Sequence, residues 1–470
     1  MSAGAAATTA ALSRPTFAAA NSEVRLAIIG AGWRGGQLAG AFSKATGCRI
    51  VTICDPDREL ADEMAAKYKA TSETDLRQVF EQDNVDAVVI ATCNHWHCLA
   101  SIWALDAGKH VYVEKPLSHT QWEGRQLIAA AAKSNKIVQI GTQQRSDPMQ
   151  AEAKQLLHQE KALGEIQYVQ ANRLGVRRPI GKRKKPLAIP SSVDYDLWLG
   201  PAADQSLYRD KLHYDWHWDF NTGSGEMGNW GVHILDDVRN VAYQDKVTTP
   251  TKVTAAGGRV SWNDAGNTPN VHYALLETDL FPTVLALSNL AVKPGGKSAW
   301  NVPLANGLKA PGSGYAVVCE GGVYLGQRGR GKALDLDGRT IREFKGGDIV
   351  PLHTQNFVDA VLASDESRLN APVLGGHHST GWCNLANVAF QAGQAGAEGE
   401  ASGNPEIWTN VALRMEALLG PHSVPATELV QSPTLSHDPA TETFTGAGSE
   451  IANRFLKREY RKGFQIEEIA

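Results

Sequence analysis

The chain has 470 residues, of which 43% are hydrophobic and 20% are charged, and its formal net charge is −4. This length exceeds what one ordinary core holds, so we expect two domains. The slight negative charge gives no reason to expect a nucleic-acid partner, and no stretch is long and apolar enough to span a membrane. The six cysteines form no CxxC pair and lie at no zinc spacing with histidine, which predicts buried free thiols and no metal site.

Residues 1–20 are rich in alanine and threonine, and the three alanines before Asn21 resemble a signal-peptidase site. The positively charged start of a signal peptide is missing, and the segment resembles the back half of a twin-arginine signal whose arginine pair lies upstream of Met1. We therefore expect an exported, periplasmic protein. The alternative is a disordered leader on a cytoplasmic protein.

A glycine-rich turn follows the first predicted strand. The letters GAGWRG come directly after the apolar run Val24–Ile29 and before a helix-like stretch, Gly36–Ser43. This is the GxGxxG dinucleotide fingerprint in its setting of strand, turn and helix. Gly30 permits the turn, Gly32 lets the backbone approach a pyrophosphate, and Gly35 lets the helix pack closely on the strand. The phosphates would bind at the helix N-terminus.

The second predicted strand, Arg49–Cys54, ends at Asp55. Asp55 lies about 20 residues after Gly35, where a carboxylate accepts hydrogen bonds from the ribose 2′-hydroxyl. Because its charge repels a 2′-phosphate, NAD is predicted in preference to NADP. Arg34 and Arg58 could offset that charge, so NADP stays open.

Strand-like and helix-like segments continue to alternate through the N-terminal part. The strands are Val85–Ala91, His110–Val113 and Lys136–Ile140, and the helices are Leu99–Gly108 and Trp122–Ser134. This predicts an α/β Rossmann domain with a doubly wound parallel sheet over residues 21–149. Such sheets bind ligands at the carboxyl ends of their strands. The cofactor-binding residues predicted here are Gly30, Gly32, Trp33, Arg34, Gly35, Asp55, Thr92, Asn94, His95, His97, Glu114, Lys115, Pro116, Gln143 and Gln144.

The pattern changes after Gly164. Strands are predicted at Ile166–Arg173, Lys252–Trp262, Val271–Glu277, Thr283–Asn289, Tyr315–Glu320, Gly322–Gln327 and Lys332–Leu336. Few helices separate them, so residues 150–470 are predicted to form an α+β domain with a large open, mainly antiparallel sheet, one face covered and one exposed. Residues 400–445 are predicted to be a surface appendage with a helix near Glu406–Leu419, and Ile451–Arg461 is predicted to be helical.

Aromatic and basic residues crowd between residues 177 and 230. Sugar rings stack on aromatic faces, so Trp216, His217 and Trp218 are predicted to contact substrate; the alternative is that these rings pack the core. The basic stretch 177–185 is interpreted as a solvated loop, or as an arm that contacts an acidic substrate or a neighbouring subunit. Arg145 and Asp237 are further candidates for contact with substrate.

The letters GAGWRG, CDPD, ATCNHWH, EKP and GTQQRS, in that order, and GEMGNWGVHILD at residues 225–236 form a familiar series. They resemble the glucose–fructose oxidoreductase, inositol dehydrogenase and MocA (Gfo/Idh/MocA) family over residues 24 to about 390. The resemblance implies a nicotinamide-dependent oxidoreductase acting on a sugar, polyol or glycoside. It also implies a homo-oligomer that forms through the sheet domain.

The same resemblance implies roles for individual residues. Lys115 would reach both cofactor and substrate, and His233 would be the catalytic histidine. Many members have an aspartate four residues before that histidine, where this chain has Asn229. Because an amide carries no charge, His233 is expected to work alone or with Asp236 or Asp237.

The chemistry agrees with these roles. Oxidation of a secondary alcohol needs a base for the hydroxyl proton, which suits histidine, and a cation beside the developing alkoxide, which suits lysine. Three functions stay open: a dehydrogenase that exchanges NAD with solution, a glycosidase or epimerase that retains NAD and oxidises its sugar transiently, and a non-catalytic NAD-binding protein.

Overall fold

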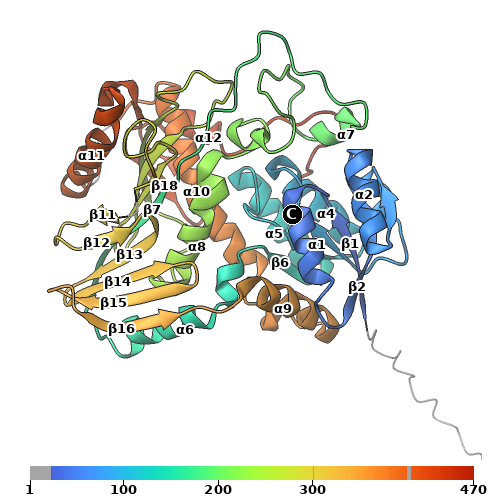
Figure 1. Cartoon of the computed structure of the whole chain (residues 1–470), viewed down its shortest axis with the longest axis horizontal. Helices are drawn as coiled ribbons and strands as arrows, with labels where there is room; N and C mark the ends of the chain where they lie inside the picture. The colour runs from blue at the N-terminus through green and yellow to red at the C-terminus, as the bar shows by residue number, and fades with distance from the viewer. Residues whose placement is uncertain (1–22, 300, 400–403, 470) are drawn as a thin grey trace, which may run out of the picture.

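The computed structural model describes residues 23–299, 301–399 and 404–469, so the predicted leader, residues 1–20, lies outside the described residues. Two sheets lie side by side (Figure 1): a six-stranded parallel sheet, and an eleven-stranded sheet that is mostly antiparallel. The predicted fold class is confirmed. No helix in the described ranges is long and apolar enough to cross a membrane.

The N-terminal sheet has the strand order β3-β2-β1-β4-β5-β6 of a doubly wound fold. Its strands are β1 (Val24–Ile29), β2 (Cys48–Cys54), β3 (Thr71–Glu73), β4 (Ala87–Ile90), β5 (His110–Val113) and β6 (Val138–Ile140), and its helices are α1 (Trp33–Phe42), α2 (Arg58–Tyr68), α3 (Leu76–Phe80), α4 (His97–Asp106) and α5 (Gln121–Ser134). Helix α1 begins three residues earlier than predicted. Gly32 is still extended, and the helix starts directly after it.

The second sheet has the order β16-β15-β14-β13-β7-β10-β9-β8-β18-β19, with β17 paired to β8. The strands are β7 (Ile166–Leu174), β8 (Lys252–Gly258), β9 (Val271–Glu277), β10 (Thr283–Ser288), β13 (Ser313–Cys319), β14 (Gly322–Gln327), β15 (Arg330–Asp335), β16 (Thr340–Lys345), β17 (Val430–Gln431), β18 (Leu435–Asp438) and β19 (Thr443–Thr445). Helices α6 (Pro148–Lys154), α8 (Val232–Val241) and α10 (Val373–Gln394) belong to this half, and α8 and α10 lie between the two sheets (Figure 1).

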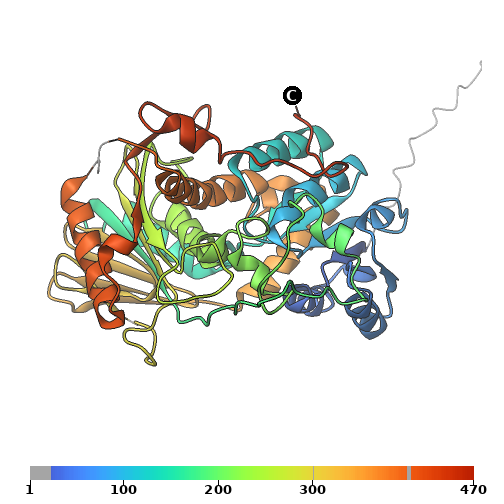
Figure 2. The same cartoon turned by 90° about the horizontal axis from the view of Figure 1, so that it is seen from above.

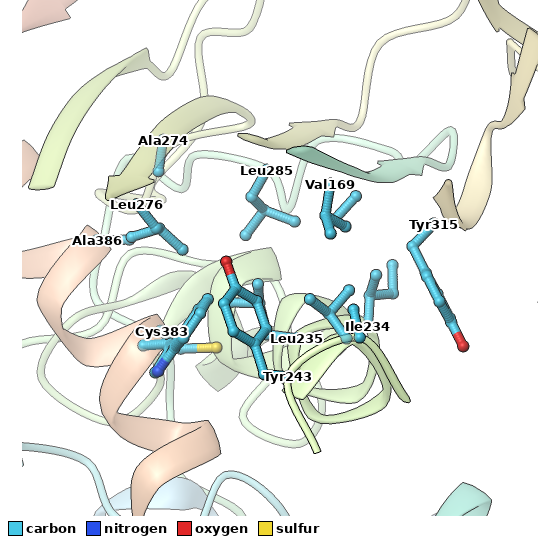
Figure 3. Packing of buried hydrophobic residues seen from close by; sticks show 14 of the residues in the cluster. Val169, Ile234, Leu235, Tyr243, Ala274, Leu276, Leu285, Tyr315, Cys383 and Ala386 are labelled. Atoms are coloured by element: carbon cyan, nitrogen blue, oxygen red, sulfur yellow. The ribbon is translucent and has the colours of Figure 1, made fainter. Parts of the chain in front are cut away.

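Apolar side chains on the inner face of this sheet pack onto α8 and α10. Val169 and Leu285 point from β7 and β10 toward Leu235 of α8, and Cys383 and Ala386 of α10 complete the cluster (Figure 3). All five are almost fully buried. Each buried Val or Leu contributes about 1.5–3 kcal/mol, so this packing fixes where α8 presents its N-terminal turn.

The expectation of an exposed outer face is wrong for most of the sheet. Helix α11 (Pro405–Leu419) buries Trp408 and Met415 against β8, β9 and β10. The hairpin β11 (Asn301–Pro303) and β12 (Lys309–Pro311) packs in a cluster with residues of β7, β13 and β14. The predicted surface appendage is therefore part of the domain, because α11 covers the sheet and β17–β19 extend it.

Two C-terminal segments return to the Rossmann domain. Helix α9 (Ile349–Ala363), which was not predicted, places Phe357 against Phe42 and Tyr112. The helix predicted over Ile451–Arg461 is wrong beyond residue 453, where α12 (Ser449–Asn453) ends.

The chain after α12 crosses to the first domain without forming a helix (Figure 2). Phe464 packs edge-on against Trp96. The Tyr460 hydroxyl donates to Glu123 Oε1 at 3.1 Å, and Arg461 donates to the Gly200 carbonyl at 3.1 Å. These tertiary partners outweigh the helical propensity of the segment.

Candidate active site

The glycine turn leaves open backbone at the start of α1. Gly30 has a φ of +96°, and a Cβ on Gly35 would lie 1.8 Å from the Gly30 carbonyl oxygen, so both glycines serve the tight strand–helix packing. At Gly32, by contrast, no atom lies within 4 Å of an added Cβ. No side chain caps α1, so its first N–H groups face the cavity. This space fits the phosphates of a dinucleotide.

Asp55 lies beside this turn at the end of β2. Its carboxylate accepts hydrogen bonds from the backbone N–H groups of Ala31 at 2.7 Å and Asp57 at 2.8 Å. Burial raises the pKa of Asp55 above its usual value, and those two donors oppose the shift. The group is 93% buried yet lines the cavity, in the position at which a ribose hydroxyl would reach it.

Neither of the two arginines that could favour NADP is paired with Asp55. Arg34 donates from Nε at 2.8 Å and from Nη2 at 2.6 Å to Glu114 Oε1. Arg58 bonds to Thr74 Oγ1 at 3.1 Å. Burial alone would raise the pKa of Glu114, but the Arg34 and Lys115 charges lower it, so the carboxylate stays ionised. Neither arginine therefore neutralises the charge of Asp55, which repels a 2′-phosphate and favours NAD over NADP.

Lys115 and His233 approach the cavity from opposite domains. Lys115 Nζ donates to the Asn229 carbonyl oxygen at 2.9 Å and to Asn229 Oδ1 at 3.3 Å. Burial lowers the pKa of Lys115 to about 8, although Glu114 opposes the shift. Burial, and then the charges of Lys115 and Arg328, hold the pKa of His233 well below its usual value. Among the described residues neither nitrogen of His233 has a hydrogen-bond partner, so a neutral imidazole is free to accept a proton.

Asn229 and His233 owe their placement to the start of α8. A π-helical turn, η5 (Met227–Gly231), carries Asn229 and runs directly into α8. Such turns occur often at functional sites because the extra residue re-aims the side chains around it. Here Asn229 faces the lysine instead of serving as a charged partner for the histidine.

The predicted roles of Asp236, Asp237 and Arg145 are corrected by the structure. Asp236 accepts from Arg145 Nε at 2.8 Å and from Ser379 Oγ at 2.6 Å. Asp237 accepts from Gln150 Nε2 at 2.6 Å. None of the three lines the cavity, because Asp236 and Asp237 of α8 bond to Arg145, Ser379 and Gln150 in a buried network that joins α8 to its neighbours. His233 therefore has no carboxylate partner from this turn.

Most of the other predicted residues do line the cavity. The full set is Gly30, Gly32, Trp33, Arg34, Asp55, Thr92, Asn94, His97, Glu114, Lys115, Gln143, Trp216, His217, Asn229 and His233. His97 bridges two backbone carbonyls, those of Pro116 at 2.6 Å and Thr92 at 3.2 Å. The rings of Trp216 and His217 stack with centroids 3.6 Å apart, which makes a flat wall at the substrate end.

Five further predicted residues lie behind the cavity wall: Gly35, His95, Pro116, Gln144 and Trp218. The two nitrogens of His95 face the carbonyls of Trp198 and Thr222, and burial lowers its pKa to about 3, so it is a neutral structural residue. Trp218 is only 3% exposed and packs inside the wall. Gly35 has the packing role that was predicted for it. The other four lie behind the residues that line the cavity.

Three arginines at the substrate end of the cavity were not among the predicted site residues. Arg173 ends β7, Arg177 follows it, and Arg328 lies in the turn between β14 and β15. Arg177 opens the basic stretch that was interpreted as a loop or an arm. Only the pairing of strands distant in sequence brings Arg328 to the same wall.

Two family models match the chain. Residues 24–142 match the oxidoreductase family with an NAD-binding Rossmann fold, and residues 179–275 match the C-terminal alpha/beta domain of that oxidoreductase family. Both models describe the Gfo/Idh/MocA oxidoreductases, so the resemblance that the motifs predicted is confirmed over these two ranges.

Individual relatives cover less of the chain. Inositol 2-dehydrogenase 4 of Saccharopolyspora erythraea is 32% identical over 38% of this chain and 54% of its own length. A glycosyl hydrolase family 109 protein of Shewanella pealeana is 32% identical over 24% of this chain and 27% of its own. The chain thus spans about half of these curated relatives or less. A solved levoglucosan dehydrogenase complex with NADH matches with a TM-score of 0.57 and 16% identity over 77% of this chain and 95% of its own, which shows a shared fold.

Proposed function

We propose that the protein is an NAD-dependent oxidoreductase that moves a hydride to or from a sugar, polyol or glycoside. One observation carries the proposal. The dinucleotide cradle at Gly32 and Asp55 opens into the same cavity as Lys115 and His233. That cavity has a volume of about 1480 Å³, more than the roughly 300–1,000 Å³ of an ordinary small-ligand pocket. It has room for a dinucleotide and a second molecule beside it.

The chain's own residues supply binding, orientation and proton transfer, while a bound nicotinamide supplies the hydride chemistry. The substrate hydroxyl donates its proton to the neutral imidazole of His233. The Lys115 ammonium donates a hydrogen bond to the same oxygen and stabilises the negative charge that develops on it. Asn229 holds Lys115 in place through its carbonyl and its amide oxygen. Trp216 and His217 offer a flat face for the sugar ring.

A direct experiment follows NADH formation at 340 nm over a panel of sugars, polyols and glycosides, after the protein has been shown to bind NADH. We expect turnover with at least one member. Failure to bind NADH would overturn the cofactor assignment, and binding without NADH formation would leave the NAD-retaining glycosidase or epimerase and the non-catalytic function.

A second candidate is a glycosidase or epimerase that retains its NAD. The match to a glycosyl hydrolase family 109 protein favours it, although that match covers only 24% of this chain. Release of aglycone without net NADH, from protein that yields stoichiometric NAD on denaturation, would support this function. NADH accumulation that equals substrate consumed would exclude it.

We also propose that the protein is a homodimer that forms through β15 and β16. The outer face is covered at β8–β10 by α11 and at β13 by the β11–β12 hairpin. Strand β16 is the edge of the sheet and is mostly exposed, and Ile341 on it is 46% exposed. Light scattering should show a dimer that Ile341→Glu converts to monomer. A monomer at all concentrations would contradict this proposal.

A further inference from the structure

Positive charge collects around Trp230 at the substrate end of the cavity. The Arg173 guanidinium lies 4.0 Å from the Trp230 ring centroid, and the Arg328 guanidinium lies 5.3 Å from the same centroid. Arg177 and Lys115 line the same cavity, and Trp230 packs edge-on against His233 at 5.8 Å. The cations are thus neighbours of the proposed reacting centre.

The carboxylate of Glu226 faces two of these cations, Arg173 and Arg177, and its contacts with both are long. Its Oε1 accepts from Arg173 Nε at 3.4 Å and from Arg177 Nη2 at 3.3 Å, both beyond the usual length of a charge-assisted hydrogen bond. Within the described residues Arg177 Nε is buried without a partner. A single carboxylate is thus shared by two guanidiniums and satisfies neither.

Arg328 has even less compensation. It donates from Nε to Gln144 Oε1 at 3.3 Å, and it forms no ion pair with any residue in the described part of the chain. The carboxyl groups of Asp237 and Glu114 attract Arg328 only without direct pairing, and Glu114 is already paired with Arg34. The terminal nitrogens of Arg328 are therefore available to a ligand.

The cations also act on one another. Burial lowers the pKa of Arg173, and the neighbouring charges of Arg177 and Arg328 lower it further, against the pull of Glu226. Like charges repel at this range unless a counter-charge lies between them. An anion bound among the three guanidiniums would relieve that repulsion.

We propose that the substrate is an acidic sugar, whose carboxylate or phosphate binds to Arg173, Arg177 and Arg328 beside His233. This inference rests on the proposed oxidoreductase function and adds its substrate class. Arg34, the cation at the start of α1, is paired with Glu114 at 2.6 Å and is not part of this cluster. The anion would anchor one end of the sugar while Lys115 and His233 hold the reacting hydroxyl.

The test is calorimetric titration of the NADH-loaded protein with matched pairs at constant ionic strength. Glucuronate and glucose 6-phosphate are each compared with glucose, and methyl glucuronide with methyl glucoside. We expect at least one acid to bind about tenfold more tightly than its neutral partner. The glucuronate and phosphate arms tell which anion the cluster takes.

Variants make the test specific. Arg328→Gln should bring the acid-to-neutral ratio close to one and leave the Kd for NADH unchanged. Arg330→Gln is the matched control, because Arg330 is exposed like Arg328 but does not line the cavity, and it should keep the preference. The inference is overturned if no acid binds more tightly than its partner, including the case in which neither binds, or if Arg328→Gln keeps the preference. Loss of NADH binding in the unaltered protein is a different failure, that of the proposed function.

Discussion

The two ends of the cavity are built from different kinds of sequence. The cofactor end comes from one β-α-β unit, in which Gly30, Gly32 and Asp55 lie within 26 residues of one another. The substrate end brings His233 and Arg328 from separate elements of the second domain. The local geometry of the β-α-β unit positions the residues of the cofactor end, whereas tertiary packing positions the residues of the substrate end. Changes at the cofactor end should therefore act on NADH affinity, and changes at the substrate end on turnover.

The largest effect is expected from His233→Ala. Removing the proton acceptor should lower kcat by about 10²–10⁴-fold, while the Kd for NADH stays the same. His422→Ala, which lies outside the cavity, is the control and should keep kcat, since among the described residues its Nε2 contacts only the Ala291 carbonyl. Stopped-flow turnover and NADH titration separate the two quantities. If His233→Ala lowered NADH affinity as much as kcat, the cofactor end and the substrate end would not be functionally distinct.

Gly35→Ala should damage the fold at the cofactor end. The added Cβ would lie 1.8 Å from the Gly30 carbonyl oxygen, so backbone must move. We expect the free energy of unfolding to fall by about 1–3 kcal/mol. Urea denaturation followed by circular dichroism measures this. An unchanged midpoint would show that the strand–helix packing is looser than described.

Gly32→Ala should leave the fold intact and weaken the binding of the cofactor. No protein atom lies within 4 Å of the new Cβ, so the thermal midpoint should not change. The methyl group enters the space proposed for the pyrophosphate, and the Kd for NADH should rise about tenfold, or about 1.4 kcal/mol. Unaltered affinity in a folded variant would place the phosphates elsewhere.

The smallest effect is a pH dependence at the substrate end. Because the pKa of Lys115 is lowered to about 8, its ammonium is present below that pH and is lost as the pH rises through it. We expect kcat/KM to fall above about pH 8, and Lys115→Arg to remove that fall because arginine stays charged. Because burial and the charges of Lys115 and Arg328 hold the pKa of His233 well below its usual value, no rise near the usual histidine pKa is expected. Such a rise would contradict the low pKa of His233.

The strands of both sheets were largely predictable, because strand patterns are local. Val271–Glu277 and Gly322–Gln327 were predicted with their observed bounds. Helix α10 was not predicted, since its glycines and polar residues obscure the apolar period and its burial depends on both domains. The outer face was predicted to be exposed because nothing local shows that α11 folds back over it.

In the site, too, residues placed by local motifs were predictable and residues placed by tertiary packing were not. The positions of Gly32, Asp55 and Lys115 followed from motifs at strand ends, and the cavity contains all three. Asp236 was chosen for its nearness to His233 in sequence, but its carboxylate is buried and bonded to Arg145 and Ser379. Arg328 carries no motif, and the pairing of β13 with the distant strand β7 brings the hairpin that carries it to the site.

The most direct test of the shared cavity is a crystal structure of the protein soaked with NADH. We predict that the pyrophosphate lies over Gly32, that the ribose hydroxyls reach Asp55, and that the nicotinamide C4 atom lies within roughly 5 Å of Lys115 Nζ or the His233 ring. A dinucleotide bound in the cradle with its nicotinamide turned away from both side chains, or bound outside the cavity, would contradict the account.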